Sequence, residues 1–100
     1  MVFVYGLIDP RSGKLFYVGS TKDLGERWYM HISEMRSAMK APSQNDKCVV
    51  IRGLLDAGLY PDIRVLELTN EENRKNRETY WLRRFVSSGV LLTNRHKHNA

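Results

Sequence analysis

Cysteine is nearly absent from this chain of 100 residues, which contains only Cys48. One cysteine cannot close a disulfide within the chain, so the sequence does not describe a disulfide-stabilised secreted domain. A zinc site is not predicted either, because it needs more ligands and the three histidines lack zinc-finger spacing. Cys48 lies in an apolar segment and is predicted to be a small core residue.

Long apolar runs are also missing. Gly6 and Asp9 interrupt the apolar N-terminal segment before it reaches the length of a signal peptide or a membrane helix. We therefore expect no membrane partner. We expect a soluble, intracellular protein of the cytoplasm or nucleoid, or of the host cytoplasm if it comes from a phage.

Acidic residues are outnumbered by basic ones: 11 Asp and Glu stand against 16 Lys and Arg, giving a net charge of +5. A basic surface attracts polyanions such as DNA, because contacts with phosphates release condensed counterions. Charge that serves only solubility is the alternative interpretation. The length and the 42% of apolar residues predict one globular domain over residues 1–95, followed by a short basic tail over 96–100.

Hydrophobic patterning predicts six elements in the order strand, strand, helix, helix, strand, helix. The strands are expected over residues 2–8, 15–19 and 62–68, with a turn at 9–13 inside a β-hairpin. Helices are expected to begin after Ser20–Asp23, after Asn45–Asp46 and at a capping box formed by Thr69–Glu72, and to end near Ala41, Gly58 and Gly89. This order predicts an α+β fold in which helices cover a small sheet.

Three polar residues lie close to the apolar faces of the predicted helices. Arg27 and His31 are four residues apart and flank the apolar stripe of the first helix. They form either a solvated edge or a cationic guanidinium and a titratable imidazole that face the sheet. Glu78 shares a helical face with Trp81, and a buried carboxylate needs a partner, so a salt bridge with an arginine and a metal ion are both open.

Taken together, these residues resemble the GIY-YIG nuclease family in order and spacing over nearly the whole chain. Phe3-Val4-Tyr5 corresponds to the first motif, and Tyr17-Val18-Gly19 corresponds to the second. The remaining matching positions are Ser20, Thr21, Asp23, Leu24, Arg27, His31, Glu78 and Asn94. Two positions depart from the motifs, because Phe3 replaces a glycine and Val18 replaces an isoleucine. Neither departure removes a group that the resemblance implies in catalysis.

The resemblance implies a three-stranded antiparallel sheet flanked by helices, and a divalent-metal-dependent hydrolysis of DNA phosphodiesters. Glu78 would hold Mg²⁺, with Mn²⁺ as a substitute, since Mg²⁺ is satisfied by one carboxylate, waters and phosphate oxygens. Arg27 would bind the scissile phosphate. Tyr5 would act as the general base and Tyr17 would orient the water or the phosphate. His31 is an alternative base, and the choice between Tyr5 and His31 stays open.

Further contacts with DNA are predicted outside the catalytic residues. The candidates are Gly19, Ser20, Lys22, Arg83, Arg84, Asn94, Arg95 and Lys97. Asn94 is either a structural amide or one that orients a phosphate, and the basic residues of this group are equally compatible with solvated charges. Specificity is expected to come from the structure of the DNA or from a partner protein or second copy, in repair, recombination or a phage. A DNA-binding module of the same fold that does not cut, and an interaction domain, are the competing hypotheses.

Overall fold

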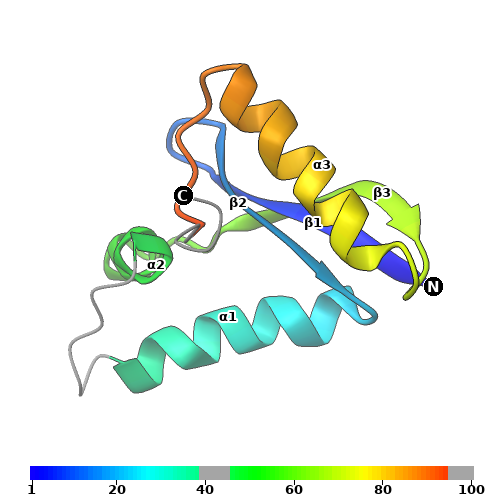
Figure 1. Cartoon of the computed structure of the whole chain (residues 1–100). Helices are drawn as coiled ribbons and strands as arrows, with labels where there is room; N and C mark the ends of the chain where they lie inside the picture. Colours follow the sequence, from blue (N-terminus) through cyan, green and yellow to red (C-terminus); the bar gives the residue numbers. More distant parts are fainter. Residues whose placement is uncertain (39–45, 95–100) are drawn as a thin grey trace.

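The computed structural model describes residues 1–38 and 46–94, and its elements follow the predicted order (Figure 1). They are β1 (Val2–Asp9), β2 (Lys14–Thr21), α1 (Leu24–Ala38), α2 (Asp46–Asp56), β3 (Asp62–Thr69) and α3 (Arg74–Ser87). Three predicted features lie outside the described part: the end of the first helix, the basic tail with Arg95 and Lys97, and the side chain of Cys48. No helix within 1–38 and 46–94 is long and apolar enough to span a membrane.

The three strands form the antiparallel sheet that the resemblance implied, in the order β2-β1-β3. β1 is the central strand, and Val4, Tyr5 and Leu7 are fully buried because both faces of this strand are covered. The β1–β2 turn closes through the Gly13 amide, which donates to the Asp9 carbonyl at 2.7 Å. Gly13 has a φ of +73°, a conformation that glycine adopts without a steric cost.

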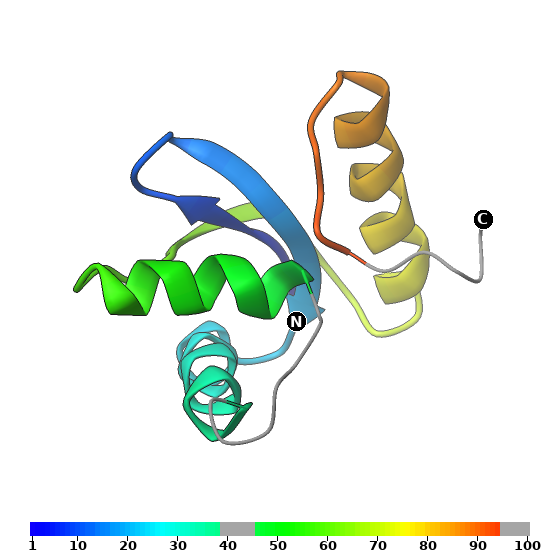
Figure 2. The ribbon, with the colours of Figure 1, turned by 90° about the vertical axis from the view of Figure 1, so that its left-hand side faces the viewer.

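Helices cover the two faces of the sheet unequally (Figures 1 and 2). α1 and α2 pack against one face, where Ile32 of α1 and Ile51 of α2 join a core cluster with Tyr5, Leu7 and Phe16. α3 crosses the opposite face and contacts all three strands. The sheet therefore separates α1 from α3, which matters for the site because both helices carry predicted catalytic residues.

The start of α3 corrects one prediction. Thr69 pairs with Val2 and remains in β3, and the helix begins only at Arg74. Asn73 occupies the N-cap position, and no side chain caps the helix. The capping box predicted from Thr69–Glu72 is therefore wrong, because sheet pairing retains the threonine that would have formed it. Three other predicted signals hold, since Asp23 Oδ1 accepts from the Glu26 amide, and Gly58 and Gly89 have positive φ after α2 and α3. The cap predicted at Asn45 lies outside the described residues.

Candidate active site

A cleft of about 360 Å³ spans the end of β2 and brings together residues from both sides of the sheet. It is lined by Tyr5, Tyr17, Ser20, Thr21, Arg27, Arg74 and Glu78. Arg27 comes from the first turn of α1, whereas Glu78 comes from α3 on the opposite face. Four of the five predicted catalytic residues thus line one cleft, and the fifth, His31, lies behind Tyr5.

Tyr5 forms the floor of the cleft, and Gly19 makes its position possible. The two residues face each other in the β1–β2 register. A Cβ atom at Gly19 would lie 2.7 Å from Tyr5 Oη and 2.9 Å from a ring carbon of Tyr17, which is closer than real Cβ contacts come. Gly19 is buried, so its structural role is to leave room for the two phenol rings.

The Tyr5 hydroxyl leads into a chain of polar contacts beneath the cleft. Its Oη atom lies 2.8 Å from His31 Nε2, and His31 Nδ1 lies 3.3 Å from the Nζ atom of Lys47 on α2. His31 is only 1% exposed, so the solvated edge that the sequence left open is wrong for this residue. Burial, together with the charges of Lys47 and Arg27, lowers the pKa of His31 to about 3, and its imidazole is neutral at physiological pH.

The phenol of Tyr5 is held in its neutral form in the absence of substrate. Burial raises its pKa well above the ordinary value of 10, and the neighbouring Tyr17 raises it further. A hydrogen bond with Arg27 and the positive charge of Arg27 both lower the pKa of Tyr5 and so oppose this shift. The Tyr5 phenol therefore resists ionisation, and the Arg27 guanidinium beside it partly offsets that resistance.

Glu78 is a half-buried carboxylate with little compensation for its burial. Its Oε1 atom accepts a hydrogen bond from the Ser20 hydroxyl at a long distance of 3.4 Å. Burial raises the pKa of Glu78, and the hydrogen bond from Ser20 and the charge of Arg74 only partly oppose this effect. Among the residues that the structure describes, Glu78 has no salt bridge with an arginine, which was one of its two predicted partners.

Arg74 is a residue of the cleft that the sequence interpretation missed. Its guanidinium donates to Ser20 Oγ at 2.8 Å and to the Ser20 carbonyl at 2.9 Å, and it forms an ion pair with Glu71 at 3.1 Å. Glu71 also pairs with Lys22 at 3.2 Å. Arg74 precedes Glu78 by four residues, so helical spacing could have indicated their common face. Lys47 was missed as well, and no sequence spacing connects it with His31.

A family comparison decides the class of this domain. The model of the GIY-YIG catalytic domain matches residues 1–88, which include all five predicted catalytic residues. The chain belongs to the GIY-YIG family. This membership indicates a nuclease-type activity, the hydrolysis of phosphodiester bonds in nucleic acid. No curated protein and no solved structure matched the chain significantly.

In this GIY-YIG domain the two named residues of the Glu-x-x-Trp segment of α3 contact different parts of the protein. Glu78 lies in the cleft, whereas the indole of Trp81 donates to Glu67 of β3 at 2.8 Å. Arg77 forms an ion pair with the same carboxylate at 2.9 Å, which lowers the pKa of Glu67. The arginine salt bridge that the sequence suggested for Glu78 is thus made by Glu67, and these contacts fix α3 against the sheet.

Asn94 lies beyond the matched residues and binds the sheet edge of the GIY-YIG domain. Its Oδ1 atom accepts from the Val18 amide at 3.0 Å, and its Nδ2 atom donates to the Val18 carbonyl at 2.7 Å. The preceding Thr93 amide donates to the Phe16 carbonyl at 2.7 Å. Of the two predicted roles of Asn94, these contacts fit the structural amide, because both ends of its side chain are occupied by β2.

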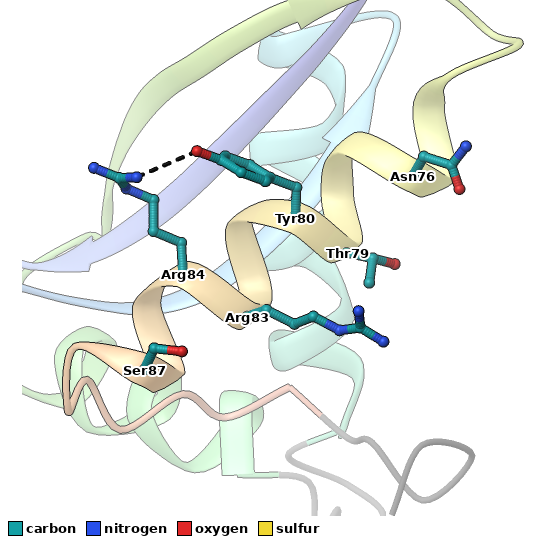
Figure 3. Close-up of a pocket in the computed structure, with 6 residues that line it drawn as sticks. All are labelled: Asn76, Thr79, Tyr80, Arg83, Arg84 and Ser87. Atoms are coloured by element: carbon teal, nitrogen blue, oxygen red, sulfur yellow. Dashed lines mark hydrogen bonds between the residues drawn. The ribbon is translucent and has the colours of Figure 1, made fainter.

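Arg83 and Arg84 lie outside the cleft, on the outer side of α3 (Figure 3). With Asn76, Thr79, Tyr80 and Ser87 they line a separate groove of about 570 Å³. Arg84 donates to the Tyr80 hydroxyl at 3.2 Å, while the Arg83 side chain extends away from this pair in Figure 3. The structure therefore does not bring these two predicted DNA contacts together with the catalytic residues.

Proposed function

We propose that this protein is a divalent-metal-dependent endonuclease that hydrolyses DNA phosphodiester bonds. The observation that carries the proposal is the convergence of two phenols, a guanidinium and one under-compensated carboxylate on a single cleft. Hydrolysis of a phosphodiester requires a nucleophilic water, stabilisation of the negative charge that builds up on the phosphate, and a means to move a proton. The residues of the cleft can meet each of these requirements.

Glu78 is the residue that would hold the metal ion. A cation beside it would relieve the cost of burying its charge, and its hydrogen bond with Ser20 is weak enough to be displaced. The described residues contain no group of three His, Cys, Asp or Glu side chains that could enclose an ion. This fits Mg²⁺ or Mn²⁺, because Mg²⁺ is commonly bound through one carboxylate, waters and substrate phosphate oxygens. When bound, the metal would stabilise negative charge on the phosphate.

Arg27 would bind the scissile phosphate with its planar guanidinium. In the free protein this side chain hydrogen-bonds to Tyr5 at the cleft floor. A phosphate in the cleft would draw the guanidinium toward itself and give a water molecule access to the Tyr5 hydroxyl. Arg74, held by Ser20 and Glu71, adds a second positive charge to the same wall.

Tyr5 is the better candidate for the general base. Both side chains are almost completely buried, but Tyr5 lines the cleft and His31 does not, so the phenol is the group that a substrate water would meet first once Arg27 moves toward the phosphate. Ionising Tyr5 is costly because of its raised pKa, and the positive charges of Arg27 and the bound metal would have to lower that cost. His31 then acts as the partner of Tyr5. Tyr17 would orient the water or the phosphate.

The decisive test replaces Glu78 by alanine and measures cleavage of DNA in magnesium. We expect Glu78→Ala to abolish cleavage while DNA binding in a gel-shift assay is largely retained, because the phosphate-binding cations are intact. The matched control is Glu72→Ala, which removes an exposed carboxylate from the turn before α3 and should cut normally. Cleavage by Glu78→Ala at the wild-type rate would refute the metal assignment. Binding without cleavage by the wild-type protein would support the alternative of a non-cutting DNA-binding module.

We also propose that specificity comes from the structure of the DNA or from a partner protein or second copy. The described elements are all used to build the sheet, its helical cover and the cleft, and none is an additional helix that could enter a DNA groove. Such an enzyme would act in repair, in recombination or for a phage. A panel of duplex, nicked, flapped and branched DNA tests this idea, since equal cleavage of all four without a partner would contradict it.

A further inference from the structure

Lys47 contacts the catalytic cluster from a helix that contributes nothing to the cleft wall. It lies on the first turn of α2, and its Nζ atom is 3.3 Å from His31 Nδ1. The same ammonium lies 5.1 Å from the centre of the Tyr17 ring. Lys47 thus contacts the partner of Tyr5 on one side and the second phenol of the cleft on the other, at a position outside the family motifs.

The chemistry of these groups determines where the imidazole proton sits. A lysine ammonium has only donors, so the His31 Nδ1 atom must accept the hydrogen bond from Lys47. His31 is neutral and has one ring proton, which must therefore be on Nε2. The Nε2–H group then donates to the Tyr5 oxygen, 2.8 Å away. The other tautomer would leave a hydrogen atom on Nδ1 pointing at the ammonium.

We propose that Lys47 is a positioning residue that holds His31 in the Nε2–H tautomer and thereby makes the Tyr5 oxygen a hydrogen-bond acceptor. This inference deepens the proposed nuclease function and rests on it for its catalytic consequence. A donor aimed at the phenol oxygen stabilises the phenolate and directs the phenol hydrogen away from His31. Without Lys47, His31 is free to adopt the opposite tautomer, in which Nε2 accepts a hydrogen bond from the Tyr5 hydroxyl and stabilises the neutral phenol.

The charged and titratable groups around Tyr5 come from several elements. They are Tyr17 of β2, Arg27 and His31 of α1, Lys47 of α2 and Glu78 of α3. Lys47 contacts His31, which lies between it and Tyr5, and it also lies beside the ring of Tyr17. The ring tautomer of His31 therefore reports the contact with His31 separately from the groups that act on Tyr5 directly.

The tautomer can be measured without any activity assay, by ¹⁵N NMR of the His31 ring in the full-length protein. We expect wild-type His31 to give the pattern of the Nε2–H tautomer at neutral pH. The isosteric variant Lys47→Met should lose this pattern in favour of the Nδ1–H tautomer or a mixture, and Lys47→Arg should keep it. A wild-type ring protonated at Nδ1, or an unchanged pattern in Lys47→Met, would overturn the inference.

Cleavage assays test the catalytic consequence. We expect Lys47→Met to lower kcat at pH 7 by about tenfold or more, the scale for residues that orient a functional imidazole, with little change in KM. The difference in kcat between Lys47→Met and the wild type should become smaller as the pH is raised, because a higher pH itself ionises a larger fraction of the Tyr5 phenol. Lys47→Arg should restore most of the rate, and Lys14→Met serves as a distant control at the start of β2.

The two hypotheses fail in different ways. If the wild-type protein does not cut DNA but has the expected tautomer, the nuclease proposal fails and the placement of the proton stands. If it cuts DNA and Lys47→Met has an unchanged kcat and pH profile, the positioning role fails and the nuclease proposal stands. A thermal melt of each variant shows whether a lost rate reflects lost folding.

Discussion

Tyr5 depends on a neighbour that has no side chain. Its ring fills the space that any other residue at position 19 would need for its own Cβ atom. The second motif therefore combines two physical requirements two residues apart on one face of a strand: Tyr17 supplies a phenol, and Gly19 accommodates both rings. The sequence indicated a close approach at Gly19, but it could not tell whether a ligand or a protein ring approaches.

Replacement of Gly19 by alanine tests this packing directly. We expect Gly19→Ala to destabilise the fold by about 1–3 kcal/mol, the usual cost of an overpacked core, and to lower the cleavage rate because Tyr5 must shift. The matched control is Gly25→Ala, since a Cβ there would meet nothing closer than 3.7 Å and alanine favours the α1 helix. Thermal melts and cleavage rates measure both effects. A Gly19→Ala variant as stable and active as the wild type would contradict the steric argument.

At the scale of elements, periodicity predicted the six segments and their order, because each carries apolar residues at strand or helix spacing, even though those of β3 and α3 are only partly buried. The β1–β2 hairpin and both helix-ending glycines follow from short-range rules. The start of α3 did not, because the pairing of Thr69 with Val2 is a contact between distant residues. A local capping signal does not start a helix where a longer strand keeps the backbone groups of the same residues hydrogen-bonded in the sheet.

The outer edge of β2 is held by the segment that follows α3. Asn94 satisfies both backbone groups of Val18, as a residue of an added strand would. Asn94→Ala removes two hydrogen bonds and should cost about 1–3 kcal/mol. In a domain of this size each 1 kcal/mol corresponds to roughly 4–8 °C in Tm. Thermal melts measure the loss, and Asn76→Ala on the exposed side of α3 is the control that should melt like the wild type.

Across the whole molecule, the candidate site joins residues from both faces of the sheet. Helical spacing grouped Arg27 with His31 and Glu78 with Trp81, since such grouping requires one helix only. In the structure Glu78 lines the cleft, whereas Trp81 contacts Glu67 of β3. Helical spacing could not show that Arg27 of α1 and Glu78 of α3 line one cleft at the end of β2, or that Lys47 of α2 contacts His31. Only the family resemblance predicted that the proposed catalytic residues converge on one site. Arg74 and Lys47 were found only in three dimensions.

Arg83 and Arg84 line a groove on the outer side of α3, away from the cleft. We predict that this groove contributes to DNA binding by the molecule as a whole. A double replacement, Arg83→Ala with Arg84→Ala, should weaken the binding of all DNA sequences alike, because contacts with phosphates carry no sequence information. Each lost phosphate contact should reduce the slope of log K against log salt by about 1. Because both arginines lie outside the cleft, kcat at saturating DNA should stay unchanged.

Binding isotherms at several salt concentrations give the slope, and single-turnover cleavage gives the rate. The control is Lys14→Ala with Arg64→Ala, which removes two equally exposed positive charges from other parts of the surface. If only net charge attracts DNA, both double variants will lose affinity equally. If the outer side of α3 contacts the DNA backbone, the Arg83 and Arg84 variant will lose distinctly more. Equal loss in the two variants would therefore contradict a contact between the outer side of α3 and the DNA backbone.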